Sequence, residues 1–281
     1  MKLVLLFAVA QAAQRIISLS PSVTEVLYGI GAFDQVVAVS SYCEYPPEVE
    51  GLPRVGGWTD TNLEQVVALR PDLVIMTGVD AQAPLMEPKL TALGIETLAV
   101  GSQSLADIYE AIETIGAAVG RPAEARALVR DMRSELAEIR ARTRDRPRPS
   151  VLVVVDRLPG MLRDIYIATE GSYLTELIEI AGGTPLTPPA PHNYTQISAE
   201  ALVVFDPEVI FDMVQALTAP TVLGGSELAE NPKAVWNAVD IRAVETDRVY
   251  SLTNKLLVHP SQFAVQAARE FAERLHPEAF E

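Results

Sequence analysis

The segment "GGWTDTNLEQVVALRPDLVIM", residues 56–76, joins a Gly-containing loop, a short helix and an apolar strand. Asn62 is a residue type that caps helices, Pro71 cannot continue a helix, and an apolar run follows. The segment "NYTQISAEALVVFDPEVIFDM", residues 193–213, has the same order. In both segments an aromatic residue precedes a Glu by six positions, and a Pro follows that Glu by seven. We therefore predict that the chain contains the same structural unit twice.

The rest of the chain also alternates between strands and helices. We predict a strand at "RIISLS" (15–20), followed by a helix with Ser22 as N-cap, Glu25 at the capping-box spacing, and Gly29 and Gly31 at its end. The sequence of 22–32, "SVTEVLYGIGA", is echoed by "SYLTELIEIAGG" at 172–183. Strands separated by helices at this rhythm are typical of parallel or mixed α/β sheets. The predicted fold is therefore two Rossmann-like α/β lobes built on a similar plan.

A long helix is predicted to join the two lobes. It follows Gly120 and has apolar residues at helical spacing, namely Ala125, Leu128, Met132, Leu136 and Ile139. A helix of about 20 residues is about 30 Å long, the width of a small domain. The predicted organisation is a signal peptide (1–13), an N-terminal lobe (14–120), the linking helix (121–146) and a C-terminal lobe (147–281). A cleft between two such lobes is a favoured position for a ligand.

Size, charge and cysteine content limit the class of protein. The chain has 281 residues, of which 49% are hydrophobic and 21% charged, as in folded globular proteins. The net charge of −15 argues against a nucleic-acid partner, because phosphate backbones bind positive surfaces. Cys43 is the only cysteine, so an intramolecular disulfide is impossible. We expect Cys43 to be a small, partly buried side chain rather than a reactive thiol.

The first residues, "MKLVLLFAVAQAA", are typical of a secretory signal peptide. Lys2 precedes an apolar run, and Ala10 and Ala12 form an A-x-A cleavage pattern. A transmembrane anchor needs about 20 apolar residues, and the sequence contains no such run. The apolar run does not end in Cys, so lipid attachment at a new N-terminal cysteine is not expected. We predict an exported, soluble protein of the periplasm.

Four segments carry motifs that occur together in one family. They are "RIISLSPSVTEVLYGIGAFDQVVAVSSYCEYPPEV" (15–49), "VGGWTDTNLEQVVALRPDLVIM" (55–76), "YIATEGSYLTELIEIAGG" (166–183) and "QISAEALVVFDPEVI" (196–210). These segments resemble the helix-linked (class III) periplasmic solute-binding proteins of ABC importers, and most closely the cobalamin-binding branch. The resemblance extends over nearly the whole chain after residue 14. It implies two lobes bridged by a rigid helix, with a metal chelate bound in the cleft.

The resemblance also implies roles for particular residues. Aromatic side chains clamp the corrin ring in the cobalamin-binding branch, and the matching positions here are Tyr42, Trp58, Tyr166 and Tyr194. A glutamate on each lobe docks on arginine pockets of the permease dimer, and Glu64 and Glu200 match these two. The C-lobe segment that contacts the ligand in the family corresponds to "LTNKLLVHPSQ" (252–262), which does not match cleanly.

Each of these residues also has an ordinary structural interpretation. A loop residue such as Trp58 could fold over the edge of a sheet, and Tyr166 in the strand-like "DIYIAT" suits a core position equally well. A Glu in the first turn of a helix is stabilised by the helix dipole by roughly 0.3–1 kcal/mol. That effect accounts for Glu64 or Glu200 singly, but it does not account for their matched placement in the two repeats.

The three histidines are His192, His259 and His276. His192 stands two residues before Tyr194, so it is a candidate axial ligand to a chelated metal; the alternative is a loop histidine in water. His276 lies in an acidic tail and is expected to be solvated. We predict no metal bound directly by the protein other than through this candidate.

The predicted function is a non-enzymatic receptor that captures cobalamin and delivers it to an ABC permease dimer with its ATPase subunits. No cofactor is expected, and the bound ligand is the corrinoid. Within the same class, the alternative ligands are haem or a ferric siderophore. From other classes, the alternatives are a two-lobed α/β metal-dependent enzyme and an interaction module without a small ligand. Clustered ligands or a cofactor loop would indicate an enzyme, and the sequence shows neither.

Overall fold

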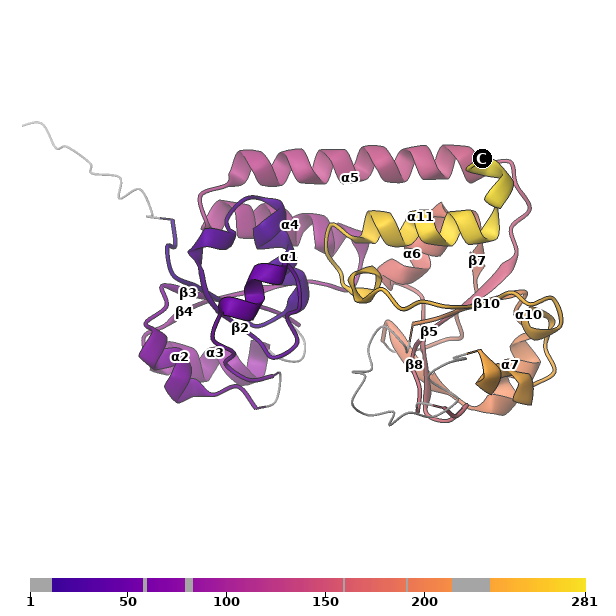
Figure 1. Cartoon of the computed structure of the whole chain (residues 1–281), viewed down its shortest axis with the longest axis horizontal. Coiled ribbons are helices and arrows are strands. Elements are labelled where there is room, and N and C mark those ends of the chain that lie inside the picture. Colours follow the sequence, from indigo (N-terminus) through magenta and orange to yellow (C-terminus); the bar gives the residue numbers. More distant parts are fainter. Residues whose placement is uncertain (1–11, 58–59, 79–82, 159, 191, 214–232) are drawn as a thin grey trace, which may run out of the picture. The chain divides into compact units, whose positions relative to one another are not determined.

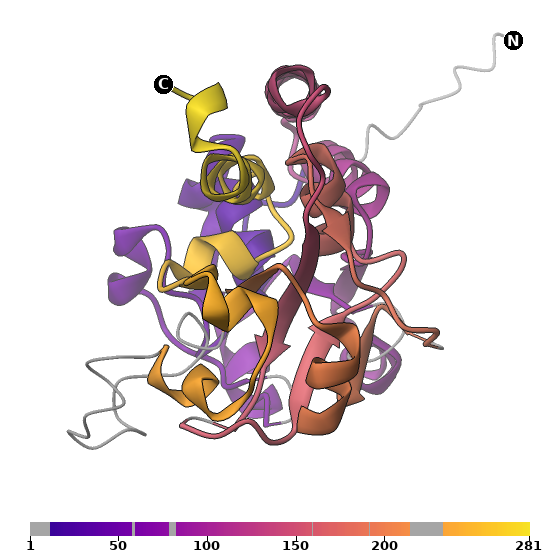
Figure 2. The ribbon, with the colours of Figure 1, turned by 90° about the vertical axis from the view of Figure 1, so that its right-hand side faces the viewer.

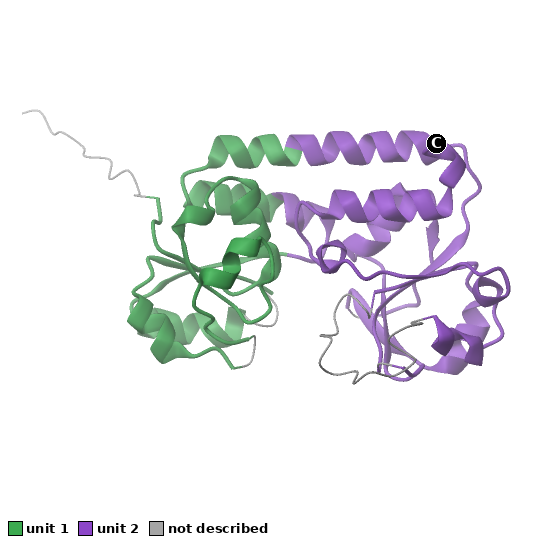
Figure 3. Cartoon of the chain, in the orientation of Figure 1, with its two compact units in different colours: residues 1–101, 110–129 green, residues 102–109, 130–281 purple. Residues whose placement is uncertain are grey.

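The computed structural model describes residues 12–57, 60–78, 83–158, 160–190, 192–213 and 233–281. Most of the predicted signal peptide therefore lies outside the described residues. The chain divides into two compact units (Figure 3). Unit 1 comprises residues 1–101 and 110–129, and unit 2 comprises residues 102–109 and 130–281. Both units include parts of α4 (Leu105–Ala118) and of α5 (Pro122–Thr143), the 22-residue helix that the sequence predicts over 121–146.

Unit 1 is built on a parallel sheet with helical crossovers (Figure 1). Its described elements are β1 (Ile16–Ser18), α1 (Pro21–Gly29), β2 (Val36–Val39), α2 (Leu63–Leu69), β3 (Leu73–Thr77), α3 (Ala83–Ala92) and β4 (Glu96–Val100), with single 3-10 turns at Phe33–Gln35 and Pro47–Gly51. The strand order is β2-β1-β3-β4, and each neighbouring pair is parallel. Parallel strands are covered on both faces, so β1 and β3 consist almost entirely of buried apolar residues.

Unit 2 has a mixed sheet. Its described elements are β5 (Ser150–Asp156), β6 (Ile165–Ala168), α6 (Tyr173–Ile180), β7 (Thr184–Pro185), β8 (Tyr194–Ile197), α7 (Ala199–Phe205), β9 (Val209–Asp212), α10 (Arg242–Glu245), β10 (Val249–Ser251) and α11 (Ala264–Leu275), with 3-10 turns at Ala234–Ala238, Lys255–Val258 and Pro277–Ala279. The strand order is β10-β9-β5-β6-β8, and β7 pairs with β5. The pairs β5–β6 and β6–β8 are antiparallel and the others are parallel. The predicted α/β fold class is confirmed.

Two helices of unit 2 lie side by side, as the two views show (Figures 1 and 2). These are α6 and α11, and both bury an apolar face. Phe271 of α11 packs on Phe211 of β9 with ring centroids 4.5 Å apart. The contact joins the helix layer to the sheet, so burial of both rings stabilises this side of unit 2.

The predicted repeat is present in the structure. α2 and α7 each have seven residues, and their N-caps Asn62 and Ser198 accept hydrogen bonds from the backbone of Gln65 and Ala201. Both helices end on a residue in the left-handed conformation, Arg70 (φ 46°) and Asp206 (φ 41°), each followed by a proline. Proline disfavours a helical conformation in the residue before it, so both helices stop at the same point.

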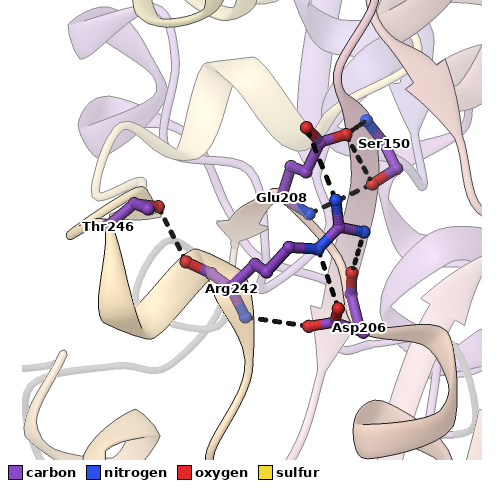
Figure 4. Close-up of polar contacts among 5 residues, drawn as sticks. All are labelled: Ser150, Asp206, Glu208, Arg242 and Thr246. Carbon is purple, nitrogen blue, oxygen red and sulfur yellow. Dashed lines mark hydrogen bonds and ion pairs between the residues drawn. The ribbon is translucent and has the colours of Figure 1, made fainter.

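A carboxylate ties each repeat to the first strand of its unit. In unit 1, Asp72 accepts hydrogen bonds from the backbone of Gln14 and Arg15 at 3.0 and 2.9 Å. In unit 2, Glu208 accepts from the backbone and hydroxyl of Ser150 at 2.8 and 3.0 Å (Figure 4). These hydrogen bonds hold β3 beside β1 in unit 1 and β9 beside β5 in unit 2.

In unit 2, Arg242 contacts both Asp206 and Glu208 (Figure 4). Its backbone and guanidinium donate to the Asp206 carboxylate at 2.9 and 2.8 Å, and the guanidinium also donates to the Asp206 carbonyl at 2.7 Å. It forms an ion pair with Glu208 at 3.6 Å. The Arg242 N–H lowers the pKa of Asp206, and the Ser150 N–H lowers the pKa of Glu208. The network thus joins α7, α10 and β5.

Two sequence predictions are wrong. Ser22 is not the N-cap of α1; the helix begins at Pro21 with Ser20 as N-cap, because proline fits the first helical position. His276 is not solvated: it is buried, and its Nε2 lies 3.2 Å from the Gly182 carbonyl. Cys43 is fully buried beside the Ser40 and Thr24 hydroxyls, and burial raises the pKa of its thiol.

Candidate ligand-binding and docking sites

Tyr42 lies at the carboxyl end of the unit 1 sheet, where ligands bind in open α/β sheets. It follows β2, is 56% exposed, and its backbone N–H donates to the Ser40 hydroxyl at 3.4 Å. A β-carbon added to Gly57 would come within 2.8 Å of the Tyr42 ring, so the ring covers this glycine. Only glycine fits at position 57 while Tyr42 keeps this orientation.

The loop that carries Trp58 is held on both sides. Ser41 donates to the Gly56 carbonyl at 2.8 Å, and Gly57 donates to the Asp60 carboxylate at 2.8 Å. The Thr61 hydroxyl also donates to the Gly57 carbonyl at 2.6 Å. Trp58 itself lies outside the described residues, so its role stays a prediction. What the structure describes is the anchoring of the loop next to Tyr42.

Tyr166 and Tyr194 lie on one face of the antiparallel pair β6–β8. Tyr166 pairs with Gln196, and Ala168 pairs with Tyr194. Residues two apart on a strand point to the same side, and directly opposed residues share a face, so the two tyrosines are diagonal neighbours. They are 41% and 38% exposed. Tyr166 is therefore not a core residue, which was the alternative interpretation of its strand.

The hydroxyl of Tyr194 contacts the N-terminus of α6. Ser172, the N-cap of α6, donates to the Tyr194 hydroxyl at 3.4 Å. Burial raises the pKa of Tyr194, and the bond to Ser172 opposes that effect. His192 is exposed in the loop before β8, and its carbonyl accepts a hydrogen bond from the Thr169 hydroxyl at 2.6 Å. The three residues His192, Tyr194 and Tyr166 are thus carried by one strand pair and the loop beside it.

A buried ionic cluster at the carboxyl ends of β5 and β9 was not identified from the sequence. Asp212 accepts hydrogen bonds from Arg157 Nε and Nη2 at 3.2 and 2.8 Å and from Trp236 Nε1 at 2.8 Å. The Arg157 and Asp212 side chains are 1% and 0% exposed. Arg157 also donates to the carbonyls of Leu158 and Met161, so the cluster orders the loop that follows β5. The sequence shows that Asp212 ends an apolar strand, but its partners Arg157 and Trp236 are distant in sequence, so the cluster could not be predicted.

Glu64 and Glu200 are exposed residues in the first turns of α2 and α7, as predicted. The Ser198 hydroxyl and the Glu200 backbone N–H lower the pKa of Glu200 by hydrogen bonding to its carboxylate. A separate cavity of about 320 Å³ in unit 2 is lined by the end of β10 and by α11. The lining of that cavity includes none of the predicted ligand or docking residues.

The described fold consists of two α/β units that share the long helix α5. The sequence pattern of one family, described as "Periplasmic binding protein", matches residues 16–256, and the chain belongs to that family. Proteins of this family bind solutes and are not enzymes. The alternative of a two-lobed metal-dependent enzyme is therefore set aside.

Curated relatives cover nearly the whole chain. An uncharacterized ABC transporter substrate-binding lipoprotein of Bacillus subtilis is 29% identical over 273 residues, covering 95% of this chain and 81% of the relative. A vitamin B12-binding protein of Vibrio cholerae is 28% identical over 260 residues, covering 92% of this chain and 87% of the relative.

Solved structures agree with this assignment. The periplasmic vitamin B12 binding protein of Vibrio cholerae superposes with a TM-score of 0.75 at 27% identity, covering 96% of this chain and 98% of that one. A periplasmic heme binding protein of Pseudomonas aeruginosa superposes with a TM-score of 0.78 at 24% identity, covering 94% and 93%. The second likeness shows the shared fold alone.

The part of the chain that the structure describes contains no helix of the length and apolarity required to span a membrane. Within the same residues, no three His, Cys, Asp or Glu side chains are grouped so as to hold a metal ion.

Proposed function

We propose that this protein captures cobalamin and delivers it to the permease of an ABC importer. The observation that carries the proposal is the pair Tyr166 and Tyr194 on one exposed face of β6–β8. A corrinoid has broad apolar surfaces, and an aromatic ring stacked on such a surface contributes roughly 0.5–1.5 kcal/mol beyond the burial of area. In the proposal, Tyr42 and Trp58 supply further rings from unit 1. The predicted cleft between the lobes stays a prediction.

A curated relative supports cobalamin as the ligand. The 28% identical relative from Vibrio cholerae is a vitamin B12-binding protein, and the alignment extends over 92% of this chain. The segments that contain Trp58 and Tyr194, 55–66 and 193–204, have no Arg or Lys. Anionic siderophores are usually bound by cationic side chains, whereas a corrinoid offers mainly apolar faces to aromatic rings. This composition favours the corrinoid.

In the proposal, Glu64 and Glu200 dock the loaded protein on the permease dimer. Exposed carboxylates form charge-assisted hydrogen bonds with arginine, and matched carboxylates on two repeats suit a dimer that offers the same pocket twice. The hydrogen bonds to the Glu200 carboxylate keep it ionised, which favours this role. The proposed location is the periplasm, reached through the predicted signal peptide at residues 1–13.

Haem is the second candidate ligand. His192 is exposed two residues before Tyr194, and His and Tyr are both axial ligands of haem iron in proteins. If His192 bound haem iron, His192→Ala would change the Soret band of the haemin complex. If His192 does not bind haem iron, the spectrum of haemin mixed with the His192→Ala variant should equal that of haemin mixed with the wild type.

Isothermal titration of the purified chain with cobalamin, cobinamide, haemin and a ferric siderophore tests the proposal. We expect cobalamin and cobinamide to bind, because both present the corrin ring to the aromatic side chains. Binding of haemin or the siderophore without either corrinoid would assign the protein to another ligand of the same class. Failure of all four to bind would favour the interaction module.

A further inference from the structure

The outward faces of α2 and α7 carry the same pattern of side chains. In α2 the exposed positions after Asn62 are Glu64, Val67 and Ala68, and in α7 the corresponding positions are Glu200, Val203 and Val204. Positions i, i+3 and i+4 of a helix lie on one face, so each set forms a continuous stripe that begins with a carboxylate and continues with apolar groups. We call these two sets the acid–apolar stripes.

The opposite side of each helix fixes the orientation of its stripe. Val66 and Leu202 occupy equivalent positions and are both fully buried in the cores of their units. The stripe of each helix therefore points away from the core of its own unit. Val67, Val203 and Val204 are 43%, 53% and 82% exposed. The outward face of a surface helix ordinarily carries polar residues, so apolar side chains at these positions are unusual for a face that meets only water.

A single exposed valine on a protein surface needs no explanation. The repetition is different, because the same acid and the same apolar positions recur on two helices that are 136 residues apart in the chain, from Glu64 to Glu200. Fold requirements account for the caps, the buried residue and the terminal proline of each helix. They do not account for a matched apolar group beside each exposed carboxylate.

We infer that the acid–apolar stripes are the contact surfaces for the permease dimer, so that Val67, Val203 and Val204 bind the permease together with Glu64 and Glu200. The inference rests on the proposed delivery function and adds the chemistry of the partner surface. Each permease subunit would present a cationic side chain bordered by an apolar surface. The apolar contact excludes water around the ion pair, and exclusion of water strengthens a charged contact at the centre of an interface.

The test compares variants for binding to the cognate permease and ATPase subunits in lipid nanodiscs. Val67→Ser with Val203→Ser and Val204→Ser removes the apolar part and keeps both carboxylates. We expect its dissociation constant for the permease complex to rise about tenfold or more, since burying one valine accounts for about one power of ten in affinity. Cobalamin affinity and the unfolding midpoint should stay at wild-type values, because the valines are exposed. Val204→Ser alone, the most exposed position, should weaken permease binding to a smaller extent.

Leu93→Ser is the matched control, because Leu93 is a half-exposed apolar residue outside the acid–apolar stripes. It should bind the permease as the wild type does. Suppose that the triple Val→Ser variant binds the permease as the wild type does, and that Glu64→Ala with Glu200→Ala does not bind. This result would overturn the role of the apolar residues and leave the docking proposal intact. Wild-type binding by the double Glu variant would overturn both the docking proposal and this inference.

Discussion

Tyr166 on β6 and Tyr194 on β8 share one exposed face of an antiparallel strand pair, because Tyr166 pairs with Gln196 and Ala168 pairs with Tyr194. The register brings together two rings that are 28 residues apart in the chain, counted from 166 to 194. The hydroxyl of Tyr194 accepts a hydrogen bond from Ser172, the N-cap of α6, and both tyrosines stay partly exposed.

Removal of either ring is expected to weaken cobalamin binding. Tyr166→Ala and Tyr194→Ala should each raise the dissociation constant by about threefold to tenfold, the loss of one stacking contact. Tyr194→Phe should bind like the wild type, since it loses only the 3.4 Å bond to Ser172. Tyr28→Ala, which removes another exposed tyrosine, is the control for calorimetric titration. Equal affinity of the two ring deletions and the wild type would contradict the proposed site.

Trp58→Ala is expected to weaken cobalamin binding at least about tenfold, because an indole ring covers more of a macrocycle than a phenol ring does. Trp58→Phe keeps an aromatic ring in the same loop and should recover most of the affinity. Titration curves for Trp58→Ala that superpose on those of the wild type would refute a stacking role for this residue.

Glu64→Ala combined with Glu200→Ala should leave cobalamin affinity unchanged and abolish uptake into vesicles that contain the reconstituted permease and ATPase subunits. The reason is that both carboxylates are exposed in the first turns of α2 and α7, and the proposed stacking uses aromatic rings rather than carboxylates. Glu64→Gln with Glu200→Gln keeps the shape and removes the charge, so it separates charge from size. Normal uptake by the alanine variant would exclude docking through these residues.

Asp212→Ala should destabilise unit 2 by about 3–5 kcal/mol, because it leaves the charge of the buried Arg157 guanidinium without its carboxylate partner. The chain has two tryptophans, so in a Trp58→Phe background the fluorescence of Trp236 reports the urea unfolding of this unit. Asp156→Ala is the control: Asp156 is exposed and accepts one bond from the Arg157 backbone, so it should cost under about 1 kcal/mol. Similar unfolding midpoints for the two variants would show that the Asp212 cluster is not stabilising.

Acid should weaken the network around Arg242. The pKa values of Asp206 and Glu208 are lower in the folded protein than their usual values of 3.8 and 4.5. A carboxylate whose pKa is lower in the folded state stabilises that state. This contribution is fully present above the pKa of the unfolded chain, that is above about pH 5, and it is lost as the pH falls through the pKa of the folded protein. We expect the free energy of unfolding to decrease below about pH 4.5. Glu208→Gln should flatten this decrease, and an unaltered pH profile for that variant would contradict the assignment.

Local chemistry predicted several features of the fold correctly. Asn62 caps α2, the proline after each short helix marks its end, and the strands of unit 1 are the apolar runs between helices. The predicted start of α1 was wrong, because a proline can begin a helix as well as end one. The helix begins at Pro21. The Ser20 hydroxyl contacts Thr77 instead of capping the helix. The prediction that His276 is solvated was wrong, because the acidic composition of the tail suggested exposure, whereas packing buries the ring against Gly182.

The amino-acid sequence by itself determined the two-unit α/β fold, the repeated short helices and the family. The fold and the repeated helices depend on periodicity, capping residues and prolines, which act within a few positions of one another, and the family was indicated by the resemblance of four segments to known members. Only the tertiary structure decided that Tyr166 faces the same side as Tyr194, and that Arg157 and Trp236 share the carboxylate of Asp212. Those relationships depend on strand register and on the burial of charge between distant segments, and no local pattern in the chain encodes either one.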